Sequence, residues 1–234
     1  MLKIQNTLVL AMLVVFAGTT SAAVITSTTL DVSAAGTGAD ILNTGTLVTA
    51  NHFGHDTDNT GNMQAAGPVT LDNGLTFGTS VADMTSGWYP IHNTTTDAHN
   101  KSPLVTNPAF DSLTNTYFWI AYSSSVSDLD IPGLTVGNDY RLQLISPNPA
   151  SATVSVEGDS GTWSGSVPAL LTATWTAGDD TANVVLTRTG GEIDFIGYAL
   201  HDVTPPIPEP VTMALMGLAF AGLGGYVKRR RKLS

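Results

Sequence analysis

The chain has 234 residues, no cysteine, and 19 acidic against 9 basic side chains, so its formal net charge at pH 7 is −10. Only 12% of its residues are charged, while 33 are threonine and 23 are glycine. This composition excludes a helical bundle or coiled coil, which would be rich in Glu, Lys, Ala and Leu. It is typical of β structure punctuated by turns. Nucleic acid is excluded as a partner, because binding it requires a basic surface.

Residues 1–23 have the pattern of a secretory signal peptide. Lys3 supplies the positive end, residues 8–17 are apolar, and Ser21 and Ala23 place small side chains at positions −3 and −1 of a cleavage site. We therefore expect the mature chain to begin at Val24. A transmembrane anchor is the alternative, but ten apolar residues are too few to cross a bilayer.

Residues 24–203 alternate apolar and polar side chains between turn signals, which predicts an all-β body. A hairpin is expected over residues 69–77, since Asn73-Gly74 accepts the positive φ angles of a tight turn. Further strands are expected around residues 117–122, 140–144, 152–156, 171–175, 182–186 and 193–200. No segment of the body keeps a helical apolar stripe. This spacing indicates a two-sheet antiparallel sandwich, jelly-roll-like in type.

The strand at residues 140–144 carries side chains of two kinds. Tyr140, Leu142 and Leu144 are predicted to face one side of the sheet, with Arg141 and Gln143 on the other. Because the chain has no cysteine, no disulfide can stabilise it. Its stability must come from the apolar core, for which a body of this length is sufficient.

Residues 204–234 are organised differently from the body. Pro208, Glu209 and Pro210 precede an uncharged stretch over residues 211–227, and a basic cluster follows: Lys228, Arg229, Arg230, Arg231 and Lys232. As a helix, residues 211–227 would reach about 25 Å, at the short end of a membrane span. Basic residues stay on the cytoplasmic side. With the N-terminus exported, the body lies outside and this tail crosses the membrane.

The order of Pro-Glu-Pro, short apolar helix and Arg-rich end resembles the PEP-CTERM sorting signal of Gram-negative bacteria. Residues 208–232 carry this resemblance, together with the N-terminal signal. What it implies is recognition by an exosortase, a membrane processing enzyme, and processing near the Pro-Glu-Pro site, in bacteria that make extracellular polysaccharide. An ordinary C-terminal anchor with a chance Pro-Glu-Pro before it is the alternative.

Parts of the body also resemble β-sandwich domains found before PEP-CTERM signals. The segments that carry this resemblance are residues 45–54, 73–77, 133–144, 174–177 and 195–200. Such domains look like the galactose-binding-like jelly rolls, so the resemblance implies a sugar-binding body.

Sugar binding uses aromatic side chains that stack on sugar rings and polar groups that fix the hydroxyls. Trp88, Tyr89, His92 and Trp163 fall in loop-like stretches and are the candidates. The alternative for the two tryptophans is a partly covered apolar plug at the rim of the sandwich. Trp119 and Trp175 lie in alternating apolar segments and are expected in the core.

Two segments hold residues that could bind a metal ion. Asp56 and Asp58 follow His52 and His55, but the two histidines would point to opposite faces of a strand. No zinc-binding spacing is present, and a solvated polar loop is the alternative.

A second pair, Asp128 and Asp130, also offers oxygen ligands at alternate positions. Neither aspartate pair continues into an EF-hand loop. A structural calcium ion remains open, and no other cofactor is expected.

No catalytic residues are expected, because the chain lacks a Gly-x-Ser-x-Gly elbow, a phosphate-binding glycine loop and a cysteine nucleophile. Between residues 24 and 206 three basic residues stand against 18 acidic ones, a balance of −15. A body this acidic does not hold a polyanion by general electrostatics.

Together these features predict an exported protein without catalytic activity, located at the cell surface or in the extracellular matrix. Its C-terminal helix anchors it before processing, and its expected activity is noncovalent association with extracellular polysaccharide. A purely structural surface protein, contacting other proteins through sheet edges and Thr-rich faces, is the first alternative. A calcium-dependent glycan-active enzyme is the second.

Overall fold

The computed structural model describes residues 22–30, 40–52, 68–79, 84–86, 89–90, 113, 118–120, 126–146, 150–165, 169–191 and 193–206. These residues form fifteen strands, which confirms the all-β prediction. The chain divides into two compact units, residues 1–203 and 204–234. The helices predicted at residues 1–23 and 211–227 lie outside the described residues.

Seven strands form the larger sheet of the body. In spatial order they are β1 (Val24–Thr29), β12 (Ala169–Thr176), β9 (Asp139–Ser146), β15 (Gly197–Asp202), β2 (Thr46–His52), β4 (Thr76–Thr79) and β3 (Val69–Thr70). Neighbouring strands are antiparallel except β2 and β4, which are parallel. The sheet is therefore nearly, but not wholly, of the antiparallel type that the sequence predicts.

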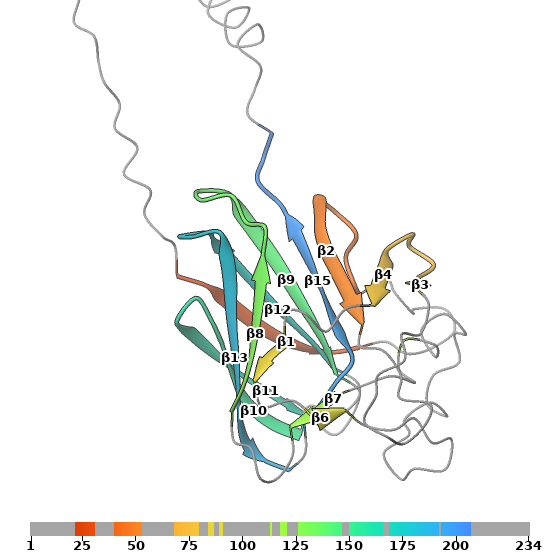
Figure 1. Ribbon diagram of the computed structural model, residues 1–234, viewed down its shortest axis with the longest axis vertical. Coiled ribbons are helices and arrows are strands. Elements are labelled where there is room, and N and C mark those ends of the chain that lie inside the picture. The colour runs from red at the N-terminus through yellow and green to blue at the C-terminus, as the bar shows by residue number, and fades with distance from the viewer. Residues whose placement is uncertain are drawn as a thin grey trace, which may run out of the picture. The chain divides into compact units, whose positions relative to one another are not determined.

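Five strands form a second sheet, in the order β11 (Asp159–Gly165), β10 (Ala150–Val156), β13 (Thr181–Gly190), β8 (Val126–Pro132) and β5 (Met84–Ser86). A small third sheet contains β14 (Ile193–Phe195), β7 (Phe118–Ile120) and β6 (Tyr89–Pro90). Figure 1 shows β8, β10 and β13 as one layer against the layer of β9, β12 and β15. The two-sheet sandwich is confirmed.

The chain crosses between the two large sheets many times. Strand β8 belongs to the five-stranded sheet and β9 to the seven-stranded sheet. The chain then returns to the five-stranded sheet with β10 and β11, crosses to the seven-stranded sheet with β12, returns with β13, and ends in the seven-stranded sheet with β15. This crossing is typical of jelly rolls and brings strands distant in sequence into contact.

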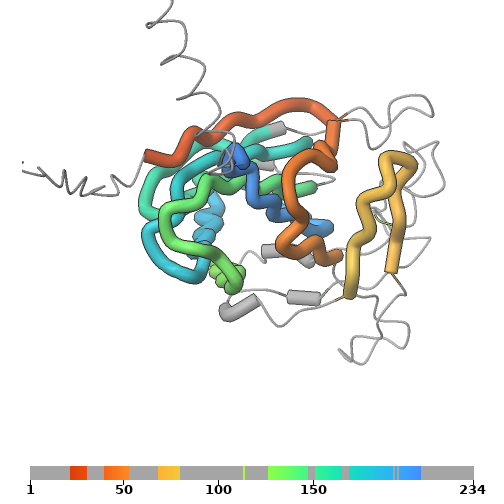
Figure 2. The backbone as a smooth tube through the Cα atoms, turned by 90° about the horizontal axis from the view of Figure 1, so that it is seen from above, coloured from red at the N-terminus to blue at the C-terminus, as the bar shows by residue number. Residues whose placement is uncertain are grey.

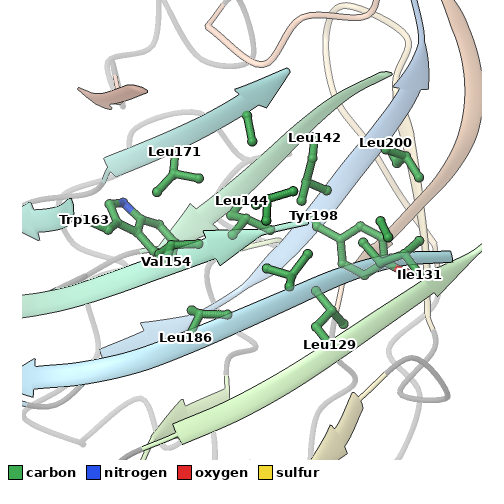
Figure 3. Close-up of a cluster of buried hydrophobic side chains, with 14 of the residues drawn as sticks. Leu129, Ile131, Leu142, Leu144, Val154, Trp163, Leu171, Leu186, Tyr198 and Leu200 are labelled. Atoms are coloured by element: carbon green, nitrogen blue, oxygen red, sulfur yellow. The ribbon is translucent and has the colours of Figure 1, made fainter. Parts of the chain in front are cut away.

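The main core lies between the two large sheets. Figure 3 shows its side chains, with Trp163, Val154 and Leu186 on the five-stranded sheet facing Leu142, Leu144 and Leu171 on the seven-stranded one. All six are 0% exposed. The alternation of strands β9 and β12 places their apolar residues in this layer, as predicted for residues 140–144 and 171–175.

The opposite face of the seven-stranded sheet is also covered. Ile41, Leu71, Leu75 and Phe77 pack there against sheet residues such as Ile145 in a second apolar cluster. Figure 2 shows the hairpin of residues 68–79 (yellow) beside the segment of residues 40–52 (orange). The sheet is thus buried on both sides around its centre, which the strand pattern alone does not predict.

The hairpin confirms the turn predicted at Asn73-Gly74. Gly74 has a φ of +82°, the left-handed region that favours glycine. The amide of Leu71 donates to the carbonyl of Leu75 at 2.9 Å and closes the turn. Asn73 fixes it to the neighbouring segment, because its Nδ2 donates to the carbonyl of Ile41 at 2.6 Å.

Two parts of the predicted strand set differ from the structure. β11 was not expected, since its segment reads as a loop, yet it pairs along its full length with β10. The strand expected at residues 193–200 is interrupted at Ile196, and its two halves, β14 and β15, belong to different sheets.

Candidate functional site

The end of the body is fixed where the sorting segment begins. After β15, the amide of Val203 donates to the carbonyl of Asp139 at 2.8 Å. Pro205 and Pro206 follow and are exposed. The predicted sorting residues lie beyond them, outside the described residues: Pro208, Glu209, Pro210, Lys228, Arg229, Arg230, Arg231 and Lys232. Among the described residues, no helix has the length and apolar character needed to cross a membrane.

The sugar-binding candidates are not brought together by the described structure. Trp88 and His92 lie outside the described residues, and Tyr89 begins the short strand β6, which is described as backbone only. The prediction that Trp163 lies in a loop-like stretch is wrong. It points inward from β11 and is 0% exposed, with its ring 6.4 Å from that of Phe195 in an edge-on contact. A side chain so enclosed offers no face on which a sugar could stack.

The metal-binding candidates gain no third ligand in the described structure. Asp56, Asp58 and His55 lie outside it, whereas His52 is buried at the end of β2. The described residues hold no group of three or more side chains suited to a metal ion.

The remaining candidate pair, Asp128 and Asp130, lies on β8, where both side chains share one partly exposed face. Asp130 accepts a hydrogen bond from Asn183 Nδ2 at 2.8 Å. These two carboxylates are therefore part of a sheet surface and not of a loop.

A buried polar cluster, which the sequence did not single out as a site, lies on the outer side of the seven-stranded sheet. Arg141 and Gln143 project from β9, and His201 lies opposite Arg141 on β15. Their exposed fractions are 8%, 1% and 0%. We call these three residues the polar clasp, because their hydrogen bonds hold one neighbouring segment.

The polar clasp holds residues 40–44 against the sheet. Arg141 Nη1 donates to Thr44 Oγ1 at 3.0 Å, and Nη2 donates to the carbonyls of Thr44 at 2.6 Å and Leu42 at 3.2 Å. Gln143 Nε2 donates to the carbonyl of Asp40 at 3.2 Å. Because the bonds end mainly on backbone oxygens, the cluster fixes the path of a covering segment.

Burial shapes the electrostatics of the polar clasp. It lowers the pKa of Arg141. Burial, and then the charge of Arg141, lower the pKa of His201 to about 4. His201 is therefore neutral at pH 7, with Nε2 lying 3.4 Å from Asn43 Oδ1.

Three atoms of the polar clasp add to the cost of its burial. Within the described residues, Arg141 Nε, Gln143 Oε1 and His201 Nδ1 are buried and make no hydrogen bond. Each such atom costs stability. The polar clasp is therefore a structural element, and protonation of His201 would lower its stability.

The outer face of the five-stranded sheet has a different chemistry. Its side chains are mostly small hydroxyls, which we call the hydroxyl face: Ser151, Thr153, Ser155, Ser160, Thr162, Ser164, Thr187 and Thr189. They alternate with core residues such as Val154, which explains why they all point outward. Cross-strand pairing aligns Ser155 with Ser160 and Thr153 with both Thr162 and Thr187. The result is one row of hydroxyls across three strands, Thr162, Thr153 and Thr187, and shorter rows across β10 and β11.

Comparison with known families identifies the C-terminal segment. Residues 206–232 match the model of the PEP-CTERM protein-sorting motif. A search of curated proteins finds no significant match to the chain. The motif supports export and sorting by an exosortase, a membrane processing enzyme, with the C-terminal segment anchored in the membrane before processing.

Proposed function

Starting from the PEP-CTERM sorting motif at residues 206–232, we propose that this protein is a non-catalytic component of the cell surface or extracellular matrix. Its sandwich body associates noncovalently with extracellular polysaccharide. The exosortase recognises the tail. The amide of Val203 donates to the carbonyl of Asp139 at 2.8 Å and fixes the end of the body to the sheet, and the exposed Pro205 and Pro206 follow where the motif begins.

The hydroxyl face is the observation that carries the polysaccharide proposal. Each of its side chains both donates and accepts hydrogen bonds, as sugar hydroxyls do. Ser160, Thr162 and Ser164 are exposed on the edge strand β11. Rows of such groups on a sheet match an extended chain of repeating hydroxyls better than a small ligand, which needs a concave site.

The charge of the body selects among polysaccharides. Only three basic residues lie between residues 24 and 206, against 18 acidic ones, and one of the three, Arg141, is buried in the polar clasp. Asp128 and Asp130 border the hydroxyl face on β8. A neutral polysaccharide is therefore the preferred partner, because an anionic one is repelled at low salt.

Titration of the processed protein against neutral and anionic polysaccharides tests this function. Thr153→Val and Thr162→Val remove hydroxyls from the face while keeping side-chain shape and strand preference. At about 1 kcal/mol for each lost hydrogen bond, each should weaken binding about fivefold. Thr26→Val and Thr28→Val, on the exposed strand β1, are the matched controls and should leave it unchanged.

Three outcomes count against the proposal. Absence of binding to every polysaccharide favours a structural protein with protein partners. If the variants of the hydroxyl face and the control variants on β1 change the affinity equally, binding uses another surface. Trp88→Ala then tests the aromatic candidate that lies outside the described residues. Release of reducing sugar, abolished by a calcium chelator, supports a glycan-active enzyme instead.

A further inference from the structure

The first described residues connect an edge of one large sheet to an edge of the other. β1 is one of the two edge strands of the seven-stranded sheet, and β11 is one of the two edge strands of the five-stranded sheet. The backbone nitrogen of Ala23 donates to Asp159 Oδ2, at the start of β11, at 2.6 Å. Two residues further along both strands, Ile25 packs over Gly161, where an added Cβ would lie 2.6 Å from Ile25 Cγ2.

Within the part of the chain that the structure describes, few other groups surround Asp159. Strands β1 and β10, which lie next to β11, contain no titratable side chain. Glu157, at the preceding turn, accepts a hydrogen bond from the amide of Asn183 at 2.9 Å. Among the described contacts, the Ala23 nitrogen is the partner of the Asp159 carboxylate, and that contact is partly buried.

The sequence allows two positions of signal cleavage. Ser21 and Ala23 as small residues at −3 and −1 give a mature start at Val24, as predicted above. Thr20 and Ala22 fit the same rule one residue earlier and give a start at Ala23. The structure distinguishes the two, because only the second retains the nitrogen that binds Asp159.

We propose that the signal is removed between Ala22 and Ala23, and that the new α-ammonium of Ala23 forms an ion pair with Asp159. Hydrolysis of this peptide bond consumes one water, leaving a carboxylate on Ala22 and an ammonium on Ala23. A single amide donor then becomes a positively charged group with three donors. A charge-assisted hydrogen bond is stronger than the amide bond that it replaces.

The burial of the two alanines agrees with this position. Ala22 is exposed, whereas Ala23 is partly buried and hydrogen-bonded. A chain that begins at Val24 would leave the Asp159 carboxylate without that partner at the edge of the sandwich. Signal removal therefore completes the contact between the two sheets, and the ion pair stabilises strand β1 through Ala23, the residue just before the strand begins.

This inference rests on the export that belongs to the proposed function, and two measurements on the exported protein test it. N-terminal sequencing should give Ala23 as the first residue. Thermal unfolding should then show a lower Tm for Asp159→Asn than for the unsubstituted protein, by about 2–4 °C near pH 7. Asp180→Asn, an exposed carboxylate at another turn, is the control and should lack this pH-dependent difference.

The pH dependence of the difference separates an ion pair from an ordinary amide contact. An α-ammonium loses its proton above about pH 8, or higher when paired, so the Tm difference should shrink as the pH rises through that value. A mature start at Val24, or a difference that does not change with pH, overturns the inference and leaves the polysaccharide proposal intact. A chain that still begins at Met1 overturns it as well, and recovery of that chain inside cells contradicts export itself.

Discussion

Acid should destabilise the body through one buried side chain of the polar clasp, His201. Its pKa falls from 6.5 to about 4, first because it is buried and then because Arg141 is charged. Between these pH values, His201 is therefore protonated in the unfolded chain but stays neutral in the folded one. The stability from neutral His201 is fully present above pH 6.5 and is lost as the pH falls toward 4. At about 1.4 kcal/mol per pH unit, the loss is about 3 kcal/mol.

Urea unfolding between about pH 7 and pH 4 measures this loss. Other groups also titrate in that range, so the informative quantity is the difference between the unsubstituted protein and His201→Gln. We expect the unsubstituted protein to lose about 3 kcal/mol more than the variant. Asn43→Ala is the matched control, because it removes the neighbour of His201 Nε2 but keeps the titrating group. Parallel pH curves for the unsubstituted protein and His201→Gln would refute the reasoning.

Three further predictions concern stability and packing. Arg141→Met removes the guanidinium bonds to residues 42–44 and should lower the free energy of unfolding by about 3 kcal/mol, with faster amide hydrogen exchange in that segment. Gly161→Ala places a Cβ against Ile25 and should cost about 2 kcal/mol in urea unfolding, partly recovered by Ile25→Ala. Trp163→Ala empties part of the main core and should cost about 4 kcal/mol, while polysaccharide titration of the folded fraction stays unchanged.

Each of these predictions has an outcome that contradicts it. Unchanged hydrogen exchange in residues 42–44 would mean that Arg141 does not hold them. A Gly161→Ala variant as stable as the unsubstituted protein would contradict the close packing of the two edge strands. Selective loss of polysaccharide binding in Trp163→Ala, with the fold intact, would restore that tryptophan as a binding residue.

The sequence predicts best those elements that are specified locally. The hairpin at Asn73-Gly74 and the alternation at residues 140–144 each depend on a few adjacent side chains, and both are confirmed. The sorting motif is contiguous as well, which is why the order of its residues along the chain is enough to recognise it.

Elements specified by distant partners were missed. β11 is rich in glycine and hydroxyl residues and has one large apolar side chain, Trp163, so its strand conformation depends on pairing with β10. The interruption at Ile196 arises because the flanking strands join different sheets, while the segment, Asp194 apart, is mostly apolar. The local pattern of apolar and polar residues predicts neither the pairing of β11 with β10 nor the division of residues 193–200 between two sheets.

The polar clasp shows the same limit for a candidate site. Sequence alternation places Arg141 and Gln143 on one side of a strand, but it does not reveal that residues 40–44 cover that side. The two segments lie about 100 residues apart, and the hydrogen bonds between them follow from the fold. A polar pair that looks solvent-facing in sequence is therefore buried.

The intact mass of the protein recovered from its producing cells, with fractionation into membrane and medium, tests the central claim most directly. Sorting by an exosortase predicts that the mature protein lacks everything after about Pro210 and that the body is released from its C-terminal anchor. A protein that retains every residue to Ser234 and occurs only in the membrane fraction would contradict processing at the sorting motif. The link to polysaccharide would then lose its main support.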